Sequence, residues 1–138
     1  MKTLPPIRLR SGAAIGHGRP TFVVAEIGNN HQGELAIARQ MVEEAARSGV
    51  DAVKFQKRDM NALFTDEGLR MPYGGPNSFG KTYGEHRLAL ELPIEDMAEL
   101  KALAESLGMV FFASAWDQVS LGELLELDVE LLKICSAD

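Results

Sequence analysis

The sequence predicts an α/β fold built on a parallel sheet, and three observations support this prediction. Short apolar runs alternate with segments of helical spacing, giving the order β-α-β-(loop)α-β-α-β along 138 residues. A polar turn rich in glycine and asparagine directly follows the first apolar run. Three of the four runs carry a single charged residue late in an otherwise apolar stretch. The first two observations indicate the fold, and the third indicates where its chemistry lies.

Composition and charge limit the class of protein. The chain is long enough for one domain with a core, and 46% hydrophobic with 25% charged residues is typical of a soluble globular chain. With 14 basic and 20 acidic residues the net charge is −6, which argues against a nucleic-acid partner. The single cysteine, Cys135, excludes an internal disulfide and fits a reducing compartment.

The sequence gives no sign of export or of membrane insertion. Met1–Arg10 lacks the apolar core of a signal peptide. No apolar segment approaches the roughly 18 residues that span a bilayer. We therefore expect a cytoplasmic protein without a membrane partner.

Residues 1–20 are expected to form an N-terminal arm or short hairpin. Ile7–Arg10 alternates between apolar and basic side chains, and Ser11-Gly12 is a turn pair. A second turn segment, Gly16–Pro20, separates the arm from the first buried strand, and its His17 is expected in a solvated turn.

The first strand and the turn after it lie within Thr21–Gly33. Four apolar residues, Phe22–Ala25, lead into Glu26, and Pro20 and Gly28 flank the run, so we expect a strand buried on both faces. A carboxylate inside such a strand is costly unless it is paired or used. Glu26 is therefore expected either in a structural ion pair or as an acid at the C-terminal end of a barrel strand, where such enzymes place their chemistry.

Three amphipathic helices and three further strands complete the pattern. Helices are expected at Glu34–Ser48, at Pro93–Leu107, and from an Asp117 cap to about Leu127, and strands at Ala52–Gln56, Met109–Ala115 and Leu131–Ser136. Gly49 and Gly108 supply helix stops. The predicted buried stripes are Leu35, Ala38, Val42 and Ala45 in the first helix, Ile94, Met97, Leu100, Leu103, Ala104 and Leu107 in the second, and Leu121, Leu124 and Leu125 in the third.

Residues 57–92 do not fit a compact connection, because helical spacing is present only near Met60–Leu69. Connections of this length are often lids or binding loops. We expect a mobile active-site loop that uses Lys81, His86 or Arg87, with a merely solvated loop as the alternative.

One segment of this connection, Gly75–Thr82, matches the nucleotide-binding pattern G-x-x-x-x-G-K-[ST]. No buried strand precedes it, and Tyr83–His86 begins no convincing amphipathic helix. A nucleotide-binding function is therefore disfavoured.

The charged strand residues predict an anion site. Because side chains alternate along a strand, Glu26, Lys54 and Lys133 occupy equivalent positions in three parallel strands. Aligned strands would bring the two ammonium groups together near the C-terminal rim, with Ser136 beside them. Lysine offers a point charge and serine a hydroxyl, so the pocket suits a phosphate or carboxylate. Glu26 would be its acid or base, or a partner that holds a lysine charged. A structural salt bridge is the alternative for any single buried lysine.

The histidines and the cysteine show no metal-ligand spacing. For His31, in the turn after the first strand, local structural hydrogen bonds and a functional role are both open. Trp116 follows the third strand and could line a pocket or simply pack, and packing is preferred.

Four motifs resemble the N-acetylneuraminate (sialic acid) synthase family. They are Ala25–Gly33 (AEIGNNHQG), Ala52–Lys57 (AVKFQK), Lys81–His86 (KTYGEH) and Leu132–Asp138 (LKICSAD), in register over residues 20–138. The loop motif is most similar to members that act on phosphorylated N-acetylmannosamine. The resemblance implies that residues 21–138 are the N-terminal half of a TIM barrel, a parallel (β/α) half-barrel with the first four strands, preceded by the N-terminal hairpin.

The resemblance also implies a reaction and residue roles. Family members condense phosphoenolpyruvate with N-acetylmannosamine or its 6-phosphate to give N-acetylneuraminate or its 9-phosphate. C3 of the enol attacks the open-chain aldehyde, which a divalent metal (Mn or Mg) polarises, and water adds at C2 before phosphate leaves. By motif position, Glu26 would orient or deprotonate groups near the aldehyde and the water. Lys54, Lys133 and Ser136 would bind phosphoenolpyruvate, and Gln56 and Asn77 would contact the N-acyl amino sugar.

The chain departs from the family pattern in its extent. A complete barrel has eight strands and typically about 250 residues, whereas four strands are predicted here, and the family's two metal-binding histidines and its C-terminal antifreeze-like domain are absent. We therefore expect the truncated chain alone to be inactive and to contain no metal ligand. Its open sheet edges are expected to cause homo-oligomerisation, domain swapping or aggregation. The alternative function is a non-catalytic half-barrel module that binds or assembles around a phosphorylated sugar.

Overall fold

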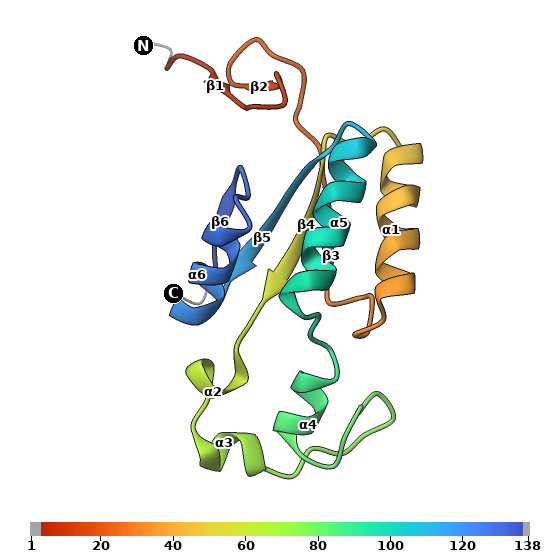
Figure 1. Cartoon of the computed structure of the whole chain (residues 1–138), viewed down its shortest axis with the longest axis vertical. Coiled ribbons are helices and arrows are strands. Elements are labelled where there is room, and N and C mark those ends of the chain that lie inside the picture. The colour runs from red at the N-terminus through yellow and green to blue at the C-terminus, as the bar shows by residue number, and fades with distance from the viewer. Residues whose placement is uncertain (1–3, 137–138) are drawn as a thin grey trace.

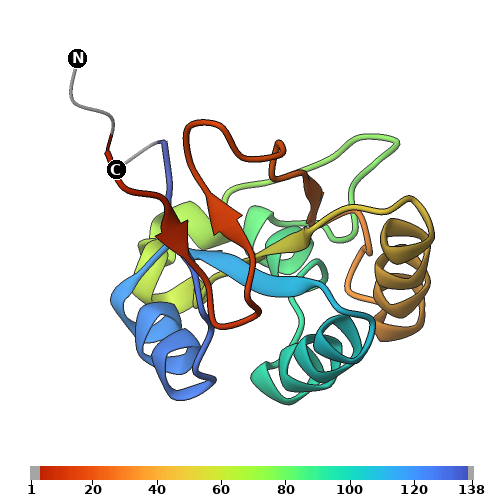
Figure 2. The ribbon, with the colours of Figure 1, turned by 90° about the horizontal axis from the view of Figure 1, so that it is seen from above.

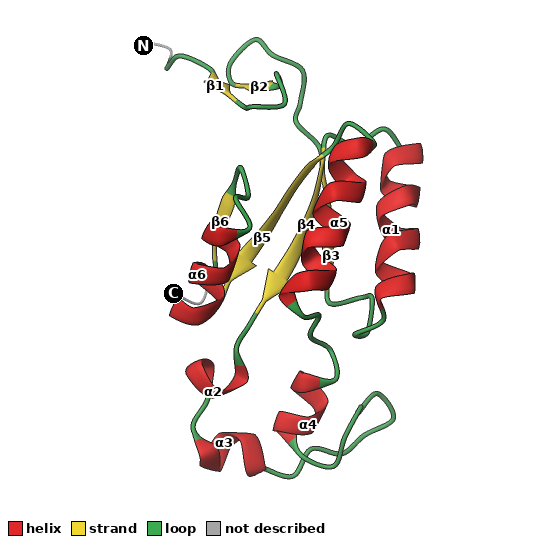
Figure 3. Cartoon of the chain, viewed as in Figure 1, coloured by secondary structure: helices red, strands yellow, loops and turns green. Residues whose placement is uncertain are grey.

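The computed structural model describes residues 4–136, and a sheet of four parallel strands lies at its centre. The strands, in the order β3-β4-β5-β6, are Val24–Gly28, Ala52–Lys57, Val110–Ala115 and Leu132–Ile134 (Figure 3). They are joined by α1 (Leu35–Arg47), by a long excursion that leads into α5 (Ile94–Ser106), and by α6 (Gln118–Glu126). The predicted parallel α/β sheet and the order of its elements are confirmed.

Helix ends follow the local signals in the sequence. Asp117 caps α6, because its carboxylate accepts a hydrogen bond of 2.7 Å from the backbone N–H of Ser120. Gly49 and Gly108, just after α1 and α5, have φ of 74° and 81°, the left-handed conformation in which glycine commonly ends a helix. No helix within residues 4–136 has both the length and the apolar character needed to cross a membrane.

The two faces of the sheet differ. Alternate residues such as Val53, Phe55 and Phe111 define the outer face, which packs under α1, α5 and α6 (Figure 2). These residues and the buried stripes of the helices form the main core. The intervening residues, such as Lys54 and Ser114, define the inner face. One layer of helices on one face of a curved sheet is the arrangement of half a barrel.

Some sequence-based burial predictions are wrong. The first strand is not buried on both faces, since Val24 and Glu26 of β3 are exposed while Ile27 is buried. β3 is an edge strand, and its inner-face residues lack cover. Leu107 and Leu125 are also exposed, because the first lies at the C-terminal cap of α5 and the second faces solvent from α6.

The predicted N-terminal hairpin is confirmed for the residues that the structure describes, while residues 1–3 of the expected arm lie outside them. β1 (Ile7–Arg8) and β2 (Ala14–Ile15) pair antiparallel. Leu9 packs with Val110 and Phe112 on the inner face, at the end where the parallel strands begin (Figure 1). The hairpin therefore covers the N-terminal end of the inner face with apolar side chains.

The excursion lies beyond the C-terminal end of β4 and contains three short helices (Figure 1). They are α2 (Met60–Leu63), α3 (Asp66–Arg70) and α4 (Tyr83–Leu88). No convincing amphipathic helix was expected from Tyr83, and the structure has a short helix there, which starts at a reciprocal capping box of Thr82 and Glu85. The buried ring of His86 stacks on Tyr73 at a centroid distance of 4.4 Å. The excursion is thus packed around an aromatic cluster rather than merely solvated.

Candidate functional site

Polar side chains from all four strands share the inner face near its C-terminal end. Glu26 of β3 is level with Lys54 of β4, and Ser114 of β5 is level with both Gln56 of β4 and Lys133 of β6. Residues level with one another in a parallel sheet, and residues two apart in one strand, project to the same side. The carboxylate and both lysines singled out from the strand pattern therefore lie on one face of the sheet.

Lys54 is at the centre of this polar group. Its side chain is only 8% exposed, and its Nζ lies 2.6 Å from Oε1 of Glu26 and 3.5 Å from Oγ of Ser114. A buried ammonium group needs such partners because losing water is costly. The Glu26 side chain remains 56% exposed, so its carboxylate can exchange Lys54 for another partner without itself becoming buried and unpaired. The structure thus shows Lys54 in an ion pair whose carboxylate side faces solvent.

Gly28 leaves room for two of these polar groups. Its φ is 57°, and a methyl group added there would lie 3.3 Å from Nε2 of Gln56 and 3.6 Å from Oε1 of Glu26. Both atoms therefore lie close to the same point beside the Gly28 backbone. A larger residue at position 28 would be strained and would crowd the Gln56 amide.

Arg58, just beyond β4, is held in a buried cluster. Its Nη1 lies 2.9 Å from Oε1 of Glu91, its Nη2 donates to Oε1 of Gln56, and its guanidinium carbon lies 4.3 Å from the centre of the Trp116 ring. Burial raises the pKa of the Glu91 carboxyl, and the hydrogen bond and charge of Arg58 oppose this. The cluster joins the start of the excursion to its end and to the residue after β5.

Lys133 differs from Lys54 in its surroundings. It is exposed and has no ion-pair partner within residues 4–136. It lines a cavity of about 560 Å³ with Trp116, Leu121 and the strand residues Leu132 and Ile134. Trp116 thus both packs against Arg58 and lines a cavity, which combines the two alternatives left open by the sequence.

Two further predicted site residues are not brought into contact with this group. Ser136 lies two residues beyond β6 and is exposed. Asn77 is exposed in the loop between α3 and α4, and within the described residues it makes no hydrogen bond to Glu26 or Lys54. Their expected roles stay predictions.

Of the two roles that the sequence left open for His31, the structure shows the local structural contacts. Its side chain is buried, and its Nδ1 accepts a hydrogen bond of 3.1 Å from the backbone N–H of Gly33. Burial lowers the pKa of the imidazole below 6.5, while a backbone hydrogen bond with Gly28 acts in the opposite direction. A neutral ring that accepts at Nδ1 therefore fixes the turn that follows β3.

Comparison with known proteins shows to which family a chain with this geometry belongs. The pattern of the NeuB family matches residues 41–138, which contain β4, β5, β6 and the excursion. The chain belongs to the NeuB family. The resemblance to sialic acid synthases seen in the sequence motifs is thereby confirmed.

Relatives with assigned names support the same family. The chain is 40% identical over 132 residues to the N-acetylneuraminate-9-phosphate synthase of Homo sapiens, covering 96% of this chain and 37% of the relative. It is 38% identical over 124 residues to the N,N'-diacetyllegionaminic acid synthase of Legionella pneumophila, covering 89% of this chain and 35% of the relative. The family's synthases therefore differ in their sugars, and the chain is similar to more than one of them.

A solved structure supports the fold. The N-acetylneuraminic acid synthetase of Leptospira borgpetersenii, crystallised with citrate, matches with a TM-score of 0.73 and 31% sequence identity. The match covers 99% of this chain and 43% of that structure. The chain therefore spans well under half the length of these NeuB relatives, and the predicted half-barrel, the first four strands of a TIM barrel, is confirmed.

The described part of this NeuB chain offers no metal site. Residues 4–136 contain no group of three or more histidine, cysteine, aspartate or glutamate side chains that could hold a metal ion. We therefore assign no metal ligand within these residues.

The segment with the nucleotide-binding pattern is not arranged to hold a phosphate. The backbone N–H groups of Lys81 and Thr82 both donate to Oε2 of Glu85, at 2.6 and 3.2 Å. A phosphate-binding loop would offer these groups to its ligand. The carboxylate of Glu85 already occupies that position.

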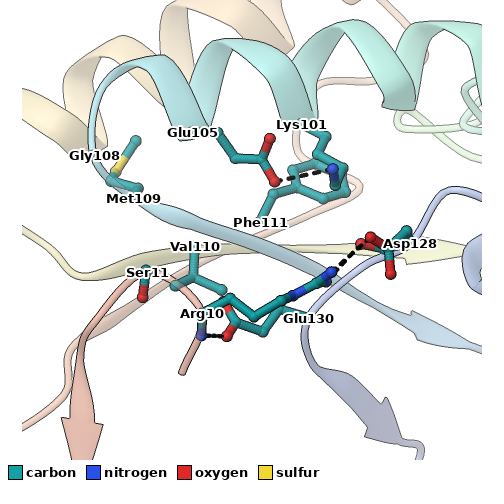
Figure 4. Close-up of a pocket in the computed structure, with 10 residues that line it drawn as sticks. All are labelled: Arg10, Ser11, Lys101, Glu105, Gly108, Met109, Val110, Phe111, Asp128 and Glu130. Atoms are coloured by element: carbon teal, nitrogen blue, oxygen red, sulfur yellow. Dashed lines mark hydrogen bonds and ion pairs between the residues drawn. The ribbon is translucent and has the colours of Figure 1, made fainter. Parts of the chain in front are cut away.

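A second cavity, of about 430 Å³, lies at the opposite end of the sheet, and its charges are already paired (Figure 4). Arg10 of the hairpin turn contacts Asp128 at 2.6 Å, and its backbone N–H donates to Glu130. Lys101 contacts Glu105 at 2.9 Å on α5. The two contacts of Arg10 attach the hairpin to the loop between α6 and β6, and we assign no ligand to this cavity.

Sequence reasoning missed three polar residues near the site: Ser114, Arg58 and Glu91. Ser114 had a signal, since it lies two residues after Phe112 in β5 and so on the same face. Arg58 and Glu91 are 33 residues apart, and no local pattern links them.

Proposed function

We propose that this chain carries the phosphoenolpyruvate-binding half of a sialic acid synthase-type active site. The single observation that supports this most directly is the placement of Glu26, Lys54 and Lys133 on one face of the sheet. Two lysines and one glutamate leave a net positive charge there, which suits a small anion bearing a phosphate and a carboxylate. The similarity to named synthases supports the same assignment.

In the proposed reaction, C3 of phosphoenolpyruvate forms a bond to the aldehyde carbon of N-acetylmannosamine or its 6-phosphate. Water adds its oxygen to C2, the bond between C2 and the phosphate oxygen breaks, and inorganic phosphate leaves. The products are N-acetylneuraminate or its 9-phosphate. The whole reaction needs no oxidant or reductant.

Each residue of this chain has a distinct proposed task. Lys54 and Lys133 hold the phosphate and carboxylate of phosphoenolpyruvate, and the hydroxyl of Ser136 adds a hydrogen bond. Glu26 lies 2.6 Å from Lys54 and is exposed, so it can accept a proton or orient the water and the aldehyde. Gln56 and Asn77 contact the amino sugar. Since the chain spans 37% of the human relative, we expect it to bind phosphoenolpyruvate and to release little or no phosphate by itself.

Thermal unfolding with ligands tests the binding half of this proposal. At a phosphoenolpyruvate concentration tenfold above its Kd, binding is expected to stabilise the chain by about 1.4 kcal/mol. Lys54→Met and Lys133→Met should each lose this stabilisation. Lys101→Met is the matched control, because Lys101 lies on α5 in the charge-paired cavity at the opposite end. An equal response in all four proteins, or none in the wild type, would contradict the proposal.

The same assay separates the alternatives. Stabilisation by ATP alone that is lost in Lys81→Ala would indicate a nucleotide-binding protein instead. Stabilisation by sugar phosphates but not by phosphoenolpyruvate would favour the non-catalytic half-barrel module. An assay of phosphate release from phosphoenolpyruvate and N-acetylmannosamine 6-phosphate then measures the activity of the chain itself.

A further inference from the structure

Arg58 lies next to the proposed site but has no part in the proposed reaction. Its side chain is 6% exposed and its guanidinium contacts three groups: the carboxylate of Glu91, the ring of Trp116 and the side-chain oxygen of Gln56. The carboxylate of Glu91 also accepts a hydrogen bond of 3.2 Å from the backbone N–H of Arg58. The guanidinium is therefore fixed from two sides, and Gln56 is its third contact.

This contact determines which way the Gln56 amide faces. A guanidinium group has only donors, so it must face the oxygen of the amide and not its NH2 group. The nitrogen Nε2 then projects away from Arg58. It lies near the point beside Gly28 that is also close to Oε1 of Glu26. The amide thus presents two N–H donors to the inner face and keeps its acceptor on the Arg58 side.

We propose that Arg58 is a positioning residue that fixes the Gln56 amide with its NH2 group toward Glu26, so that Gln56 donates to an oxygen atom of the bound amino sugar. The identity of the ligand rests on the proposed function, whereas the orientation of the amide does not. Without Arg58 the amide can rotate, and half of its orientations present an acceptor where the sugar oxygen needs a donor.

A lysine at position 58 cannot replace the arginine. Its ammonium group is a compact point charge that can still pair with Glu91. It has no planar fork with which to reach Glu91 and Gln56 together, nor a flat surface to lie on Trp116. Arg58→Lys therefore keeps the buried charge pair and removes the hold on Gln56, which makes it the informative variant.

The amide orientation can be tested without any ligand. In 1H–15N NMR spectra of the chain, the side-chain NH2 resonances of Gln56 should shift in Arg58→Lys toward those of the glutamine at position 40 on the exposed surface of α1. The resonances of the His31 backbone amide serve as a control for the fold. Unchanged Gln56 resonances in a folded Arg58→Lys variant would overturn the proposal.

A double-mutant cycle tests the consequence for the sugar. Arg58→Lys should raise the Kd for N-acetylmannosamine 6-phosphate about tenfold, the effect of one lost hydrogen bond. It should have no further effect in a Gln56→Leu background, and phosphoenolpyruvate should stabilise all of these variants. A purely structural role would give the same loss with and without Gln56, and that result would overturn the proposal.

Gln56→Glu covers the case in which Arg58→Lys does not fold. Arg58 still holds one oxygen of the new carboxylate, and the other oxygen faces the sugar as an acceptor. Weaker sugar binding supports the proposal, and wild-type binding contradicts it. If phosphoenolpyruvate fails to stabilise the wild type, the proposed function is wrong, while the NMR comparison still decides the role of Arg58.

Discussion

Phe55 and Lys54 are neighbours on β4, but they face opposite sides of the sheet and have different surroundings. Phe55 is completely buried on the outer face and stacks on Phe111 at a centroid distance of 5.3 Å. Lys54 on the inner face is buried only with the help of Glu26 and Ser114. The comparison indicates that the outer face supplies most of the stability and the inner face carries the polar groups of the proposed site, although both are encoded in alternate residues of the same strands.

Replacing Phe55 and Lys54 in separate variants gives the largest expected difference in the free energy of unfolding. Phe55→Ala should lower the free energy of unfolding by about 3–5 kcal/mol, because it leaves a cavity in the main core. Lys54→Met should cost about 1 kcal/mol or less, since Glu26 is exposed and regains water. Urea denaturation followed by circular dichroism measures both values. Similar losses would mean that the two faces do not divide their tasks in this way.

The turn after β3 links the outer core to the excursion, and a pair of glycine variants tests how tightly. A methyl group at Gly33 would lie 2.1 Å from the carbonyl oxygen of Ala89, whereas at Gly49 it would meet nothing within 4 Å. Both glycines have positive φ, so each alanine variant carries a strain of about 1–2 kcal/mol.

Gly33→Ala should therefore cost about 2–5 kcal/mol in unfolding free energy, as the overlap adds about 1–3 kcal/mol, and Gly49→Ala only about 1–2 kcal/mol. Denaturant unfolding of both variants makes the comparison. Equal losses would show that the turn moves away from Ala89 at little cost and does not tie the two regions together.

Asp117 provides a smaller, pH-dependent link at the C-terminal end of the sheet. Burial alone would raise the pKa of its carboxyl, but hydrogen bonds from the backbone N–H groups of Ser120 and Asp59 and from the Ser120 hydroxyl lower the pKa below 3.8. A lowered carboxyl pKa adds stability that is present above pH 3.8 and is lost as the pH falls through the folded-state value.

Asp117→Asn should consequently cost about 1 kcal/mol at pH 7, because an NH2 group replaces one of the two oxygens that accept hydrogen bonds from Ser120 and Asp59. The difference from the wild type should shrink below pH 3.8, where the wild-type carboxyl takes up its proton. Unfolding free energies of both proteins at pH 7 and pH 3 test this. A difference independent of pH would assign the effect to packing alone.

Much of this arrangement could be predicted from local patterns. The four strands, three long helices and the hairpin follow from apolar spacing and from turn residues, and their order implies a parallel sheet. Side-chain alternation alone indicated that Glu26, Lys54 and Lys133 share a face, and the register agrees. The capping box of Thr82 and Glu85 was also readable in the sequence, although the glycine-rich pattern before it suggested a loop.

Contacts between distant residues could not be predicted in this way. Arg58 meets Glu91 and Trp116 only after the excursion has folded back on itself, and a single sequence contains no signal for that pairing. Burial at the sheet edge was overestimated because apolar content shows that a side chain can be covered, not that it is. Leu132 and Ile134 of β6 are apolar outer-face residues that no described helix covers.

The smallest expected change in stability concerns this uncovered edge, where the outer face lacks the protection that it has elsewhere. Ile134 is 81% exposed on β6, an edge strand whose backbone groups can pair with a second chain. We expect the chain to self-associate and Ile134→Lys to reduce the associated fraction, because a charge at an edge strand opposes pairing. The free energy of unfolding should change by no more than about 0.5 kcal/mol.

Light scattering over a range of protein concentrations measures the association. Val119→Lys on α6, also exposed but away from the edge, is the control. A monodisperse wild-type monomer, or equal effects of both lysines, would mean that the open edge is not what drives assembly.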